Sequence, residues 1–584
     1  MEKSKERVLR GLLKRPGLST EEKNVLAELL ASNRSTQAEH ERSPLAKATI
    51  PSQAPKALTF TLNRAAYKRR GPSQDKVRIC LDFGTAMSKA WATGRDAAET
   101  LPLFIGRSAG GDGLTVASSI FIAENGRIYL GQEAERQHRA DMRPGRARFD
   151  NLKRMLSEAE VGTELSAIPL RSGIDPSGSG LSGGDLLVLY LSWLTDLSEE
   201  ALIDAISATK GTFSLKKLDP RAVARRFAIP CFESADGKEG RERSTWARAI
   251  MADALLRVQV LVDTLHGKWD RLTTDGLTPL MRQIHSLDVT NLSHLMAADS
   301  AVREPIAAGA SRFDAALDRK DEPAQSPIRQ LLLVVDAGAG TTDFALFQAI
   351  TSVGDSRPRY GLLRKSVRMC RIAGNEFDGI LRPIILDACG VDSQKLSADD
   401  LAYAQTDLDS RIRDIKRTLF DQKTMTIDLR PHFSGVVSVA SLLADSKMRK
   451  DGDELLEIRR EILATMFTQE DLDALRMTGA RAFEVHVLLT GGSASVPIIR
   501  QLGTGYVEIG GMQFRFAAVE KLPEWINRLP RNVAQRLADV YPQSAVAIGG
   551  SVPQMPKELN DLEIPVTPAR QGIRRLERFQ VSGR

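Results

Sequence analysis

The clearest pattern of apolar and polar residues along the chain occurs twice. Leu331–Val335 is a continuous apolar run, typical of a strand buried on both faces, and it ends at Asp336 and a glycine-rich turn. Val77–Ala90 repeats the plan: an apolar strand reaches Asp82, a short polar turn follows, and apolar residues resume. One copy lies in each half of the chain, so the pattern predicts a duplicated fold with two equivalent hairpins.

The residues of the two turns have the chemistry of phosphate and magnesium binding. Glycines allow close approach to the backbone, and amide N–H groups and hydroxyls suit phosphate oxygens. Carboxylates suit Mg²⁺ and its waters. The first turn holds Asp82, Gly84, Thr85 and Ser88, and the second holds Asp336, Gly338, Gly340, Thr341, Thr342 and Asp343. Ordinary hairpins are the plain alternative, since Gly and Asp are common in turns, but the repetition favours two hairpins gripping one polyphosphate.

A third stretch, Val485–Leu502, reads as a buried strand, then Gly491 and Gly492, then a helix beginning near Ser493. Paired glycines at such a place let a flat ring or a ribose lie against the backbone.

In this order the three stretches resemble the two phosphate loops and the adenosine loop of the actin-like ATPase superfamily, and within it the DnaK-type heat-shock chaperones. The resemblance covers roughly residues 76–552. Shorter similarities to the chaperone motifs lie at Ile128–Gln137, Phe149–Leu156, Phe227–Phe232, Arg303–Ala308, Ala373–Asp378, Ile415–Leu419 and Pro542–Gly549.

The resemblance implies an α/β fold of two lobes, each with a ribonuclease-H-like mixed sheet, and a cleft between them that binds ATP or ADP with Mg²⁺. It implies slow hydrolysis, with Lys153 neutralising charge on the γ-phosphate and Glu304 orienting the attacking water. The catalytic residues it indicates are Asp82, Lys153, Glu304, Asp336 and Thr341. Those for nucleotide binding are Gly84, Thr85, Gly338, Gly340, Thr342, Lys416, Arg417, Gly491, Gly492 and Ser493. Asp82, Asp336 and Asp343 would hold Mg²⁺ through water.

Several residues depart from the family pattern. Thr85-Ala86 has one hydroxyl where the family has two, and Ala339 replaces a glycine of the second loop. Arg413 stands where the family has an acidic adenosine ligand, and Ser495 where it has an arginine. The phosphate side is therefore closer to the family pattern than the side that selects the base.

Composition narrows the class of protein. The 584 residues are 42% apolar and 27% charged, which suffices for several cores, and no apolar run approaches the roughly 20 residues of a membrane span. Met1–Arg15 lacks the apolar core of a signal peptide, and the four cysteines are scattered. We therefore expect a cytoplasmic protein with reduced thiols. There is no Walker motif, and the GxGxxG string at Gly178–Gly183 follows no apolar strand, so P-loop and Rossmann folds lose support.

The charge lies in the two ends of the chain. Residues 1–75 hold 15 Lys and Arg against 8 Asp and Glu, net +7, which equals the net charge of the whole chain. Aromatic side chains for base stacking are almost absent there, so nucleic acid is not an expected partner. Met1–Leu30 predicts two short amphipathic helices and Ala31–Asp75 a linker. We expect a protein partner to bind residues 1–75 or the C-terminal tail.

The chain divides into an N-terminal extension at 1–75, a first lobe at 76–330, a second lobe at 331–552 and a tail at 553–584. Helices are predicted at Asp185–Leu197, Thr245–Leu265 and Asp407–Phe420, and residues 266–300 predict an extra helical element without assigned chemistry. The helix Asp407–Phe420 and the segment Glu454–Ala480 are expected to frame the fourth subdomain.

Three functions remain open at this point. A DnaK-type chaperone needs a peptide-binding domain after the ATPase, and the 34 residues after Gly550 are too few for one. We therefore expect a nucleotide-dependent conformational switch without its own peptide-binding domain. The alternative is an MreB-type filament or scaffold protein, which shares the Asp-Gly-Thr loops and the Glu304-Pro305 pair. A binding module with little turnover is the third, and a sugar or carboxylate kinase of the superfamily is less favoured.

Overall fold

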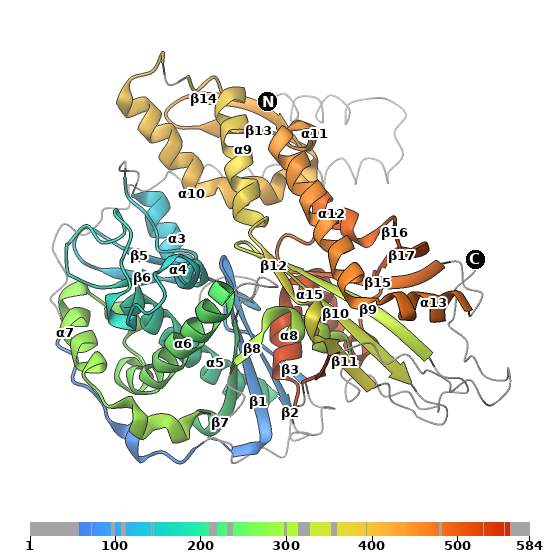
Figure 1. The fold of residues 1–584 in the computed structure, drawn as a ribbon. Coiled ribbons are helices and arrows are strands. Elements are labelled where there is room, and N and C mark those ends of the chain that lie inside the picture. The colour runs from blue at the N-terminus through green and yellow to red at the C-terminus, as the bar shows by residue number, and fades with distance from the viewer. Residues whose placement is uncertain are drawn as a thin grey trace, which may run out of the picture. The chain divides into compact units, whose positions relative to one another are not determined.

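The computed structural model describes residues 58–560 except 72, 95–99, 107–112, 142, 144, 209–218, 230–237, 297–300, 314–327, 352–358, 393, 478–481, 530 and 554. These residues belong to one compact unit, Pro55–Arg584. It is a mixed α/β structure with several sheets (Figure 1). The α/β class predicted from the sequence is confirmed. The helices predicted at Met1–Leu30 lie outside the described residues.

The first large sheet is mixed and carries the first repeat of the sequence pattern. Its order is β3-β2-β1-β7-β8, with β4 beside β2. β1 and β2 are antiparallel, whereas β7 and β8 continue the sheet in parallel. The strands are β1 (Ser73–Phe83), β2 (Met87–Gly94), β3 (Thr100–Leu103), β4 (Thr115–Ala117), β7 (Val223–Ile229) and β8 (Ala301–Arg303). A small hairpin of β5 (Ile120–Ile122) and β6 (Ile128–Leu130) precedes α3 (Gly131–Ala140) and α4 (Leu152–Glu158).

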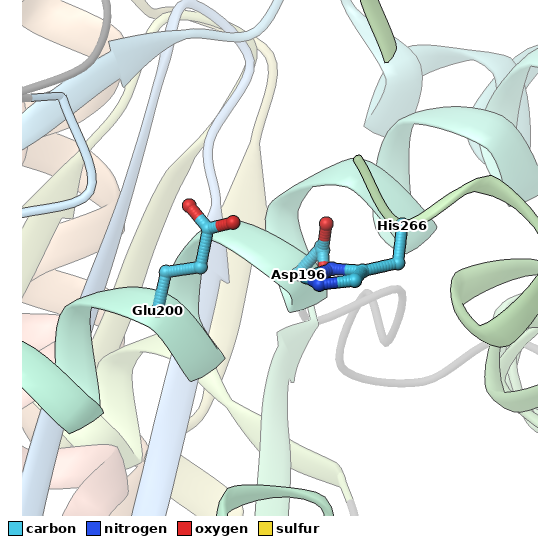
Figure 2. Close-up of side chains that lie close together, drawn as sticks. All are labelled: Asp196, Glu200 and His266. Atoms are coloured by element: carbon cyan, nitrogen blue, oxygen red, sulfur yellow. The ribbon is translucent and has the colours of Figure 1, made fainter. Parts of the chain in front are cut away.

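Two long helices, α5 (Gly183–Ala208) and α6 (Lys238–Leu265), pack together beside this sheet (Figure 1). They confirm and extend the two helices predicted there. The extra helical element is also confirmed, as α7 (Thr274–His285) between the 3-10 turns Trp269–Arg271 and Val289–Leu295. It is joined to α5 at its start, where the His266 ring lies 2.8 Å from the buried Asp196 carboxylate (Figure 2).

The predicted linker at Ala31–Asp75 is wrong for its last part. Residues 58–71, including a 3-10 turn at Ala65–Lys68, pack against α6 and the extra helical element. Phe60 is buried, Arg69 pairs with Asp263, and His294 Nε2 lies 3.0 Å from the Arg69 carbonyl oxygen. The packed structure therefore begins before Lys76, because one aromatic side chain and a few hydrogen bonds anchor a segment of otherwise polar composition.

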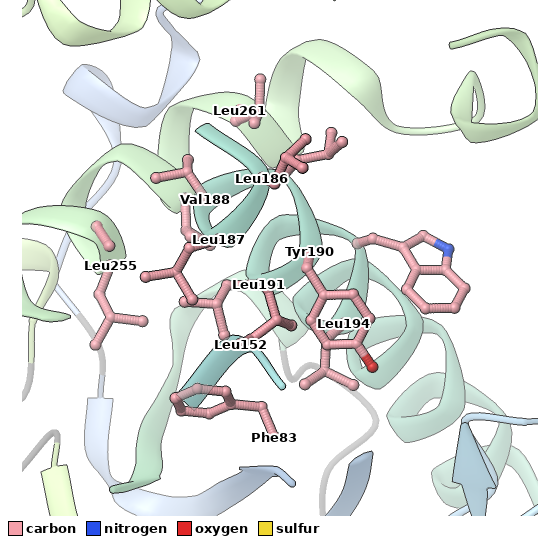
Figure 3. Packing of buried hydrophobic residues seen from close by; sticks show 14 of the residues in the cluster. Phe83, Leu152, Leu186, Leu187, Val188, Tyr190, Leu191, Leu194, Leu255 and Leu261 are labelled. Atoms are coloured by element: carbon pink, nitrogen blue, oxygen red, sulfur yellow. The ribbon is translucent and has the colours of Figure 1, made fainter. Parts of the chain in front are cut away.

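The core beside the first sheet is built largely by α5. Leu186–Leu191 are all fully buried, because the helix is apolar on every side and is covered by the sheet and by α6. Figure 3 shows these side chains meeting Leu255 and Leu261 of α6 and Leu152 at the start of α4. The same cluster therefore fixes the position of α4 relative to the first sheet.

The second large sheet is mixed and carries the second repeat. Its order is β16-β17-β15-β9-β10-β11-β18, with β12 beside β10. The central pair is antiparallel, and β15 runs parallel to β9. The strands are β9 (Ile328–Ala337), β10 (Thr342–Thr351), β11 (Arg359–Leu363), β12 (Arg368–Cys370), β15 (Ala482–Thr490), β16 (Tyr506–Ile509), β17 (Met512–Ala518) and β18 (Lys557–Leu559). β18 shows that the predicted C-terminal tail begins inside this sheet; the rest of the tail after residue 560 lies outside the described residues.

A helical layer follows the second repeat. It holds α9 (Gly374–Ala388), α10 (Ala398–Gln422), α11 (Val439–Ala444), α12 (Ser446–Met466) and α13 (Gln469–Met477), with a hairpin of β13 (Thr424–Leu429) and β14 (Phe433–Ser438). α10 confirms the helix predicted at Asp407–Phe420, and α12 and α13 occupy much of the segment Glu454–Ala480. The helix expected to begin near Ser493 begins only at Pro497 and is short, α14 (Pro497–Arg500), because a turn occupies the residues between.

Two helices, α8 (Glu304–Phe313) and α15 (Arg531–Ser551), join the two sheets through one core. This core takes Cys80 and Trp91 from the first sheet and Val334 and Phe347 from the second. α15 contacts β1, β2 and β7 as well as β15. Within the described residues, no helix is both long and apolar enough to cross a membrane.

Candidate active site at the ends of the two hairpins

The two hairpin turns line one cavity of about 340 Å³. Eleven of the residues predicted for the site line it, from five separate parts of the chain. They are Asp82, Gly84, Thr85, Lys153, Glu304, Asp336, Gly338, Gly340, Thr341, Gly491 and Gly492. Because these residues are up to about 400 positions apart in sequence, the fold brings together a site that no single segment could form.

In the first hairpin, Asp82 is the last residue but one of β1 and pairs across the ladder with Lys89 of β2. Directly opposed residues project from the same face of a sheet, and the Lys89 Nζ lies 3.3 Å from Asp82 Oδ2. Gly84 and Thr85 lie in the turn and border the cavity. Burial would raise the pKa of Asp82, but Lys89 and Lys153 outweigh it and hold that pKa below its usual value.

In the second hairpin, Asp336 pairs with Asp343 and Ala337 with Thr342. Asp336 lines the cavity and accepts a 2.9 Å hydrogen bond from the Thr490 hydroxyl. Thr342 and Asp343 are not among the residues that line the cavity: Asp343 accepts a 2.7 Å bond from Thr341 Oγ1, and the Thr342 hydroxyl donates to the Ile372 carbonyl. The structure therefore places Asp343 behind Thr341, as a support for the loop.

Asp336 lies where negative charge is poorly balanced. Burial raises its pKa to about 7, and repulsion from Glu304 and Asp82 adds to the effect. A cation beside Asp336 would relieve both causes.

Lys153 joins the first hairpin to α8. α4 carries it into the cavity, where its ammonium pairs with Glu304 and lies 3.3 Å from Asp82 Oδ1. It also lies 4.6 Å from the centre of the Phe83 ring. Burial opposes the charge of Lys153, yet Glu304 and Asp82 outweigh it and hold its pKa above the usual value. The lysine is therefore positively charged, although it is only 5% exposed.

The third predicted stretch closes the cavity floor. Gly491 has φ +88°, and a side chain there would collide with the Ala337 carbonyl, so only glycine fits comfortably. Gly492 opens onto free space. Ser493 does not line the cavity; its backbone N–H donates to the Ala337 carbonyl and its hydroxyl to the Gly338 carbonyl. It thus ties this stretch to the second hairpin.

The two basic residues predicted to hold the nucleoside lie outside the cavity lining. Lys416 pairs with Asp378 at 2.7 Å and donates to the Gly374 carbonyl at the start of α9. Burial lowers its pKa despite that pairing. Arg417 is exposed and pairs with Asp414 at 3.3 Å. Lys416 nevertheless lies beside the second hairpin, because the Gly374 N–H donates to the Gly338 carbonyl, whereas Arg417 does not line the cavity.

Asn151 links the two hairpins across the cavity. It has left-handed backbone angles, φ 63° and ψ 42°, which are uncommon outside glycine, and its N–H donates to the Thr85 carbonyl. Its side-chain oxygen accepts bonds from Arg413 at 3.2 Å and from Asn375 at 3.4 Å. The Asn375 N–H in turn donates to the Ala339 carbonyl of the second hairpin at 2.7 Å.

The Arg413 guanidinium also lies 3.3 Å from the Asp150 carboxylate. It therefore spans from α10 to the segment before α4 and joins these two parts of the chain.

Sequence reasoning missed several residues that line the cavity: Lys89, Arg154, Glu158, Arg371, Asn375, Glu376 and Gln543. Lys89 could have been found from the hairpin pattern, since a four-residue turn after Phe83 pairs it with Asp82. Asn375 and Glu376 belong to a stretch that the resemblance singled out, without a role for either side chain. Arg371 had no pattern that would have shown it.

Comparison of the sequence with protein-family models gives no match, and no curated protein matches the chain.

Proposed function

We propose that this chain is a slow ATPase that binds ATP with Mg²⁺ in the cavity and hydrolyses the bond to the γ-phosphate. The observation that carries the proposal is the convergence of both Asp-Gly-Thr turns, Lys153 and Glu304 on one cavity. Two glycine turns with hydroxyls supply phosphate ligands, and buried charged groups supply the electrostatics that phosphoryl transfer requires.

The proposal extends to the fold. The two mixed sheets, each with an antiparallel hairpin ending at the cavity, are compatible with the two lobes of an actin-like ATPase and their ribonuclease-H-like sheets. α8 and α15, which share a core with both sheets, would then be the connection about which the lobes turn.

The donor set fits Mg²⁺. Asp336 is a buried carboxylate on the cavity wall with an uncompensated charge, and oxygen ligands are those that Mg²⁺ prefers. Asp82 would take part through water, because both of its oxygens already lie 3.3 Å from an ammonium. Mg²⁺ held there supplies charge neutralisation for the phosphates. Asp343 would act indirectly, through Thr341.

The remaining roles follow from charge and position. Lys153 and Lys89 present ammonium groups to the cavity and would stabilise negative charge on the phosphates. Thr85 and the backbone N–H of Gly340 would donate to phosphate oxygens, whereas the Gly338 N–H donates to the Thr341 carbonyl and the Thr341 hydroxyl to Asp343. Glu304 would accept a hydrogen bond from the attacking water, whose oxygen forms the new bond to phosphorus while ADP leaves. For this to happen, the Lys153 ammonium must leave Glu304 and turn toward the phosphate.

Within the superfamily we favour a DnaK-type, nucleotide-dependent conformational switch in the cytoplasm, with a protein partner at residues 1–75 or the C-terminal tail. Two of the chaperone-like stretches support this: α4 carries Lys153 to the cavity, and α9 begins at its edge. The MreB-type alternative predicts ATP-dependent filaments, which negative-stain microscopy would reveal.

The test is steady-state phosphate release by the full chain with Mg·ATP. Asp336→Asn should abolish most of the activity. Asp473→Asn, on the exposed surface of α13, is the matched control and should keep the wild-type rate. Equal rates for the wild type and Asp336→Asn would refute the assignment.

A further inference from the structure

A second cluster of polar side chains lies outside the cavity, where the extra helical element leaves α6. Asp196 and Glu200 are four residues apart on α5 and therefore project from the same face of the helix. His266 is the first residue after α6 and approaches them from the turn that follows this helix (Figure 2). One nitrogen or oxygen from each of the three lies within 4.8 Å of the others.

The cluster has an excess of negative charge. Asp196 is buried, and the His266 ring beside it is positive only when protonated. Glu199, the next acid on the helix, is already compensated by Arg225. Two carboxylates at i and i+4 repel each other, so a cation at this place would remove an unfavourable interaction.

The buried carboxylate is also oriented from behind. The Trp269 indole N–H donates to Asp196 Oδ2 at 2.6 Å, and the Asp196 Oδ1 lies 2.8 Å from His266 Nδ1. The indole N–H is an outer-shell donor of the kind that holds a metal-binding carboxylate in place. On the open side, the His266 side chain is 48% exposed, and Glu200 is exposed, so an ion can reach them.

We propose that Asp196, Glu200 and His266 form a binding site for a divalent transition-metal ion, with Zn²⁺ as the best match. One imidazole and two carboxylates are ligands that Zn²⁺ accepts, and three protein ligands leave a position for water. The imidazole argues against Mg²⁺ or Ca²⁺, which take oxygen ligands. The site shares no residue with the cavity lining, so it is independent of the proposed ATPase activity.

Binding would fasten the extra helical element to α5. Both His266 and Trp269 stand at its beginning, directly before α7, and residues 58–71 pack against the same element. Metal binding should therefore stabilise this side of the molecule.

The experiment is equilibrium dialysis of the metal-free, untagged full chain against Zn²⁺, with Co²⁺ absorption as a second readout of an imidazole-containing site. The variants are Glu200→Gln and His266→Gln, both at exposed positions where folding should be kept. Asp204→Asn, the next acid on the same helix, is the matched control. Mg²⁺ is the control ion.

We expect one tightly bound Zn²⁺ in the wild type and in Asp204→Asn, and affinity at least about 100-fold lower in each ligand variant, since loss of an outer-shell partner alone costs 10–100-fold. Zn²⁺ should raise the melting temperature of the wild type but not of the ligand variants. Absence of saturable Zn²⁺ binding, or undiminished binding in both ligand variants, would overturn the proposal.

Discussion

The ion cluster around Lys153 allows a quantitative test of how the cavity is held together. Lys153 is buried between Asp82 and Glu304. Its replacement by Met leaves Glu304 as a buried carboxylate that has lost its ammonium partner. Loss of one member of a buried ion pair costs about 3–5 kcal/mol, so Lys153→Met should lower the free energy of unfolding by that amount at pH 7.

The second variant separates charge from packing. Glu304→Gln alone should cost about 1–3 kcal/mol, because Lys153 keeps Asp82 as a partner. The double variant has neither a carboxylate at position 304 nor an ammonium group at position 153, and Asp82 is still paired with Lys89. The double variant should therefore lose less stability than the sum of the single variants, by about 2 kcal/mol.

The assay is urea unfolding of the full chain at pH 7, followed by far-ultraviolet circular dichroism. Lys447→Met is the matched control, since this lysine is 53% exposed in its pairs with Glu376 and Asp451 and should contribute less than about 1 kcal/mol. Losses for Lys153→Met and Glu304→Gln that add within about 0.5 kcal/mol would refute the reasoning. Phosphate release should stay abolished in the double variant even though its stability is partly restored.

Three further predictions concern packing, pH and ligand release. In a thermal melt, Gly549→Ala should destabilise the chain by about 3 kcal/mol, because the new methyl group would overlap the Ala307 carbonyl. The control Gly379→Ala, with free space around it, should be neutral or stabilising by up to about 1 kcal/mol. Burial lowers the pKa of the His138 imidazole below its ordinary value of about 6.5, so the unfolded chain binds a proton first as the pH falls. The contribution of neutral His138 to stability is complete above pH 6.5 and is lost below it. His138→Leu should therefore weaken the fall in the urea midpoint between pH 7 and 5.5. An unchanged dependence of the midpoint on pH would contradict this. Asn151→Gly keeps the left-handed backbone but removes the side-chain hydrogen bonds that link the hairpins, which are worth about 0.5–1.5 kcal/mol. Fluorescent ADP should therefore dissociate about 3–10-fold faster in stopped flow. An unchanged rate would show that the link is not coupled to release.

The hairpins could be predicted because local sequence specifies them. An apolar run that ends at an aspartate and glycines determines both the strand and its turn, and Asp82 and Asp336 both reach the cavity. Lys153 and Glu304 were found only through resemblance, since nothing local shows that a lysine on a short helix turns inward. Their approach depends on the packing of α4 and α8 against different elements.

Other features depend on long-range pairing that a single sequence does not reveal. Arg413 looked like a lost nucleoside ligand, yet it contacts Asp150, more than 250 positions away. Lys416 pairs with Asp378, 38 positions away, and no local pattern shows this partner. Residues 58–71 read as a linker because their apolar content is low, and Phe60 anchors them through a contact with α7 that no local pattern encodes.

The position of α15 has a consequence for the synthesis of the protein. Cys80, on the first sheet, lies against Gly550, and the Arg226 guanidinium donates to the Gly550 and Val552 carbonyls. The ribosome must therefore add more than 450 residues after Cys80 before α15, which packs against this sheet, has been made. Until then the inner face of the first sheet, with Trp91, lacks its cover, and exposed apolar surface of this kind promotes aggregation. The nascent chain should accordingly depend on chaperones for most of its elongation, and a ribosome stalled before residue 531 should carry a first sheet that proteases cut readily.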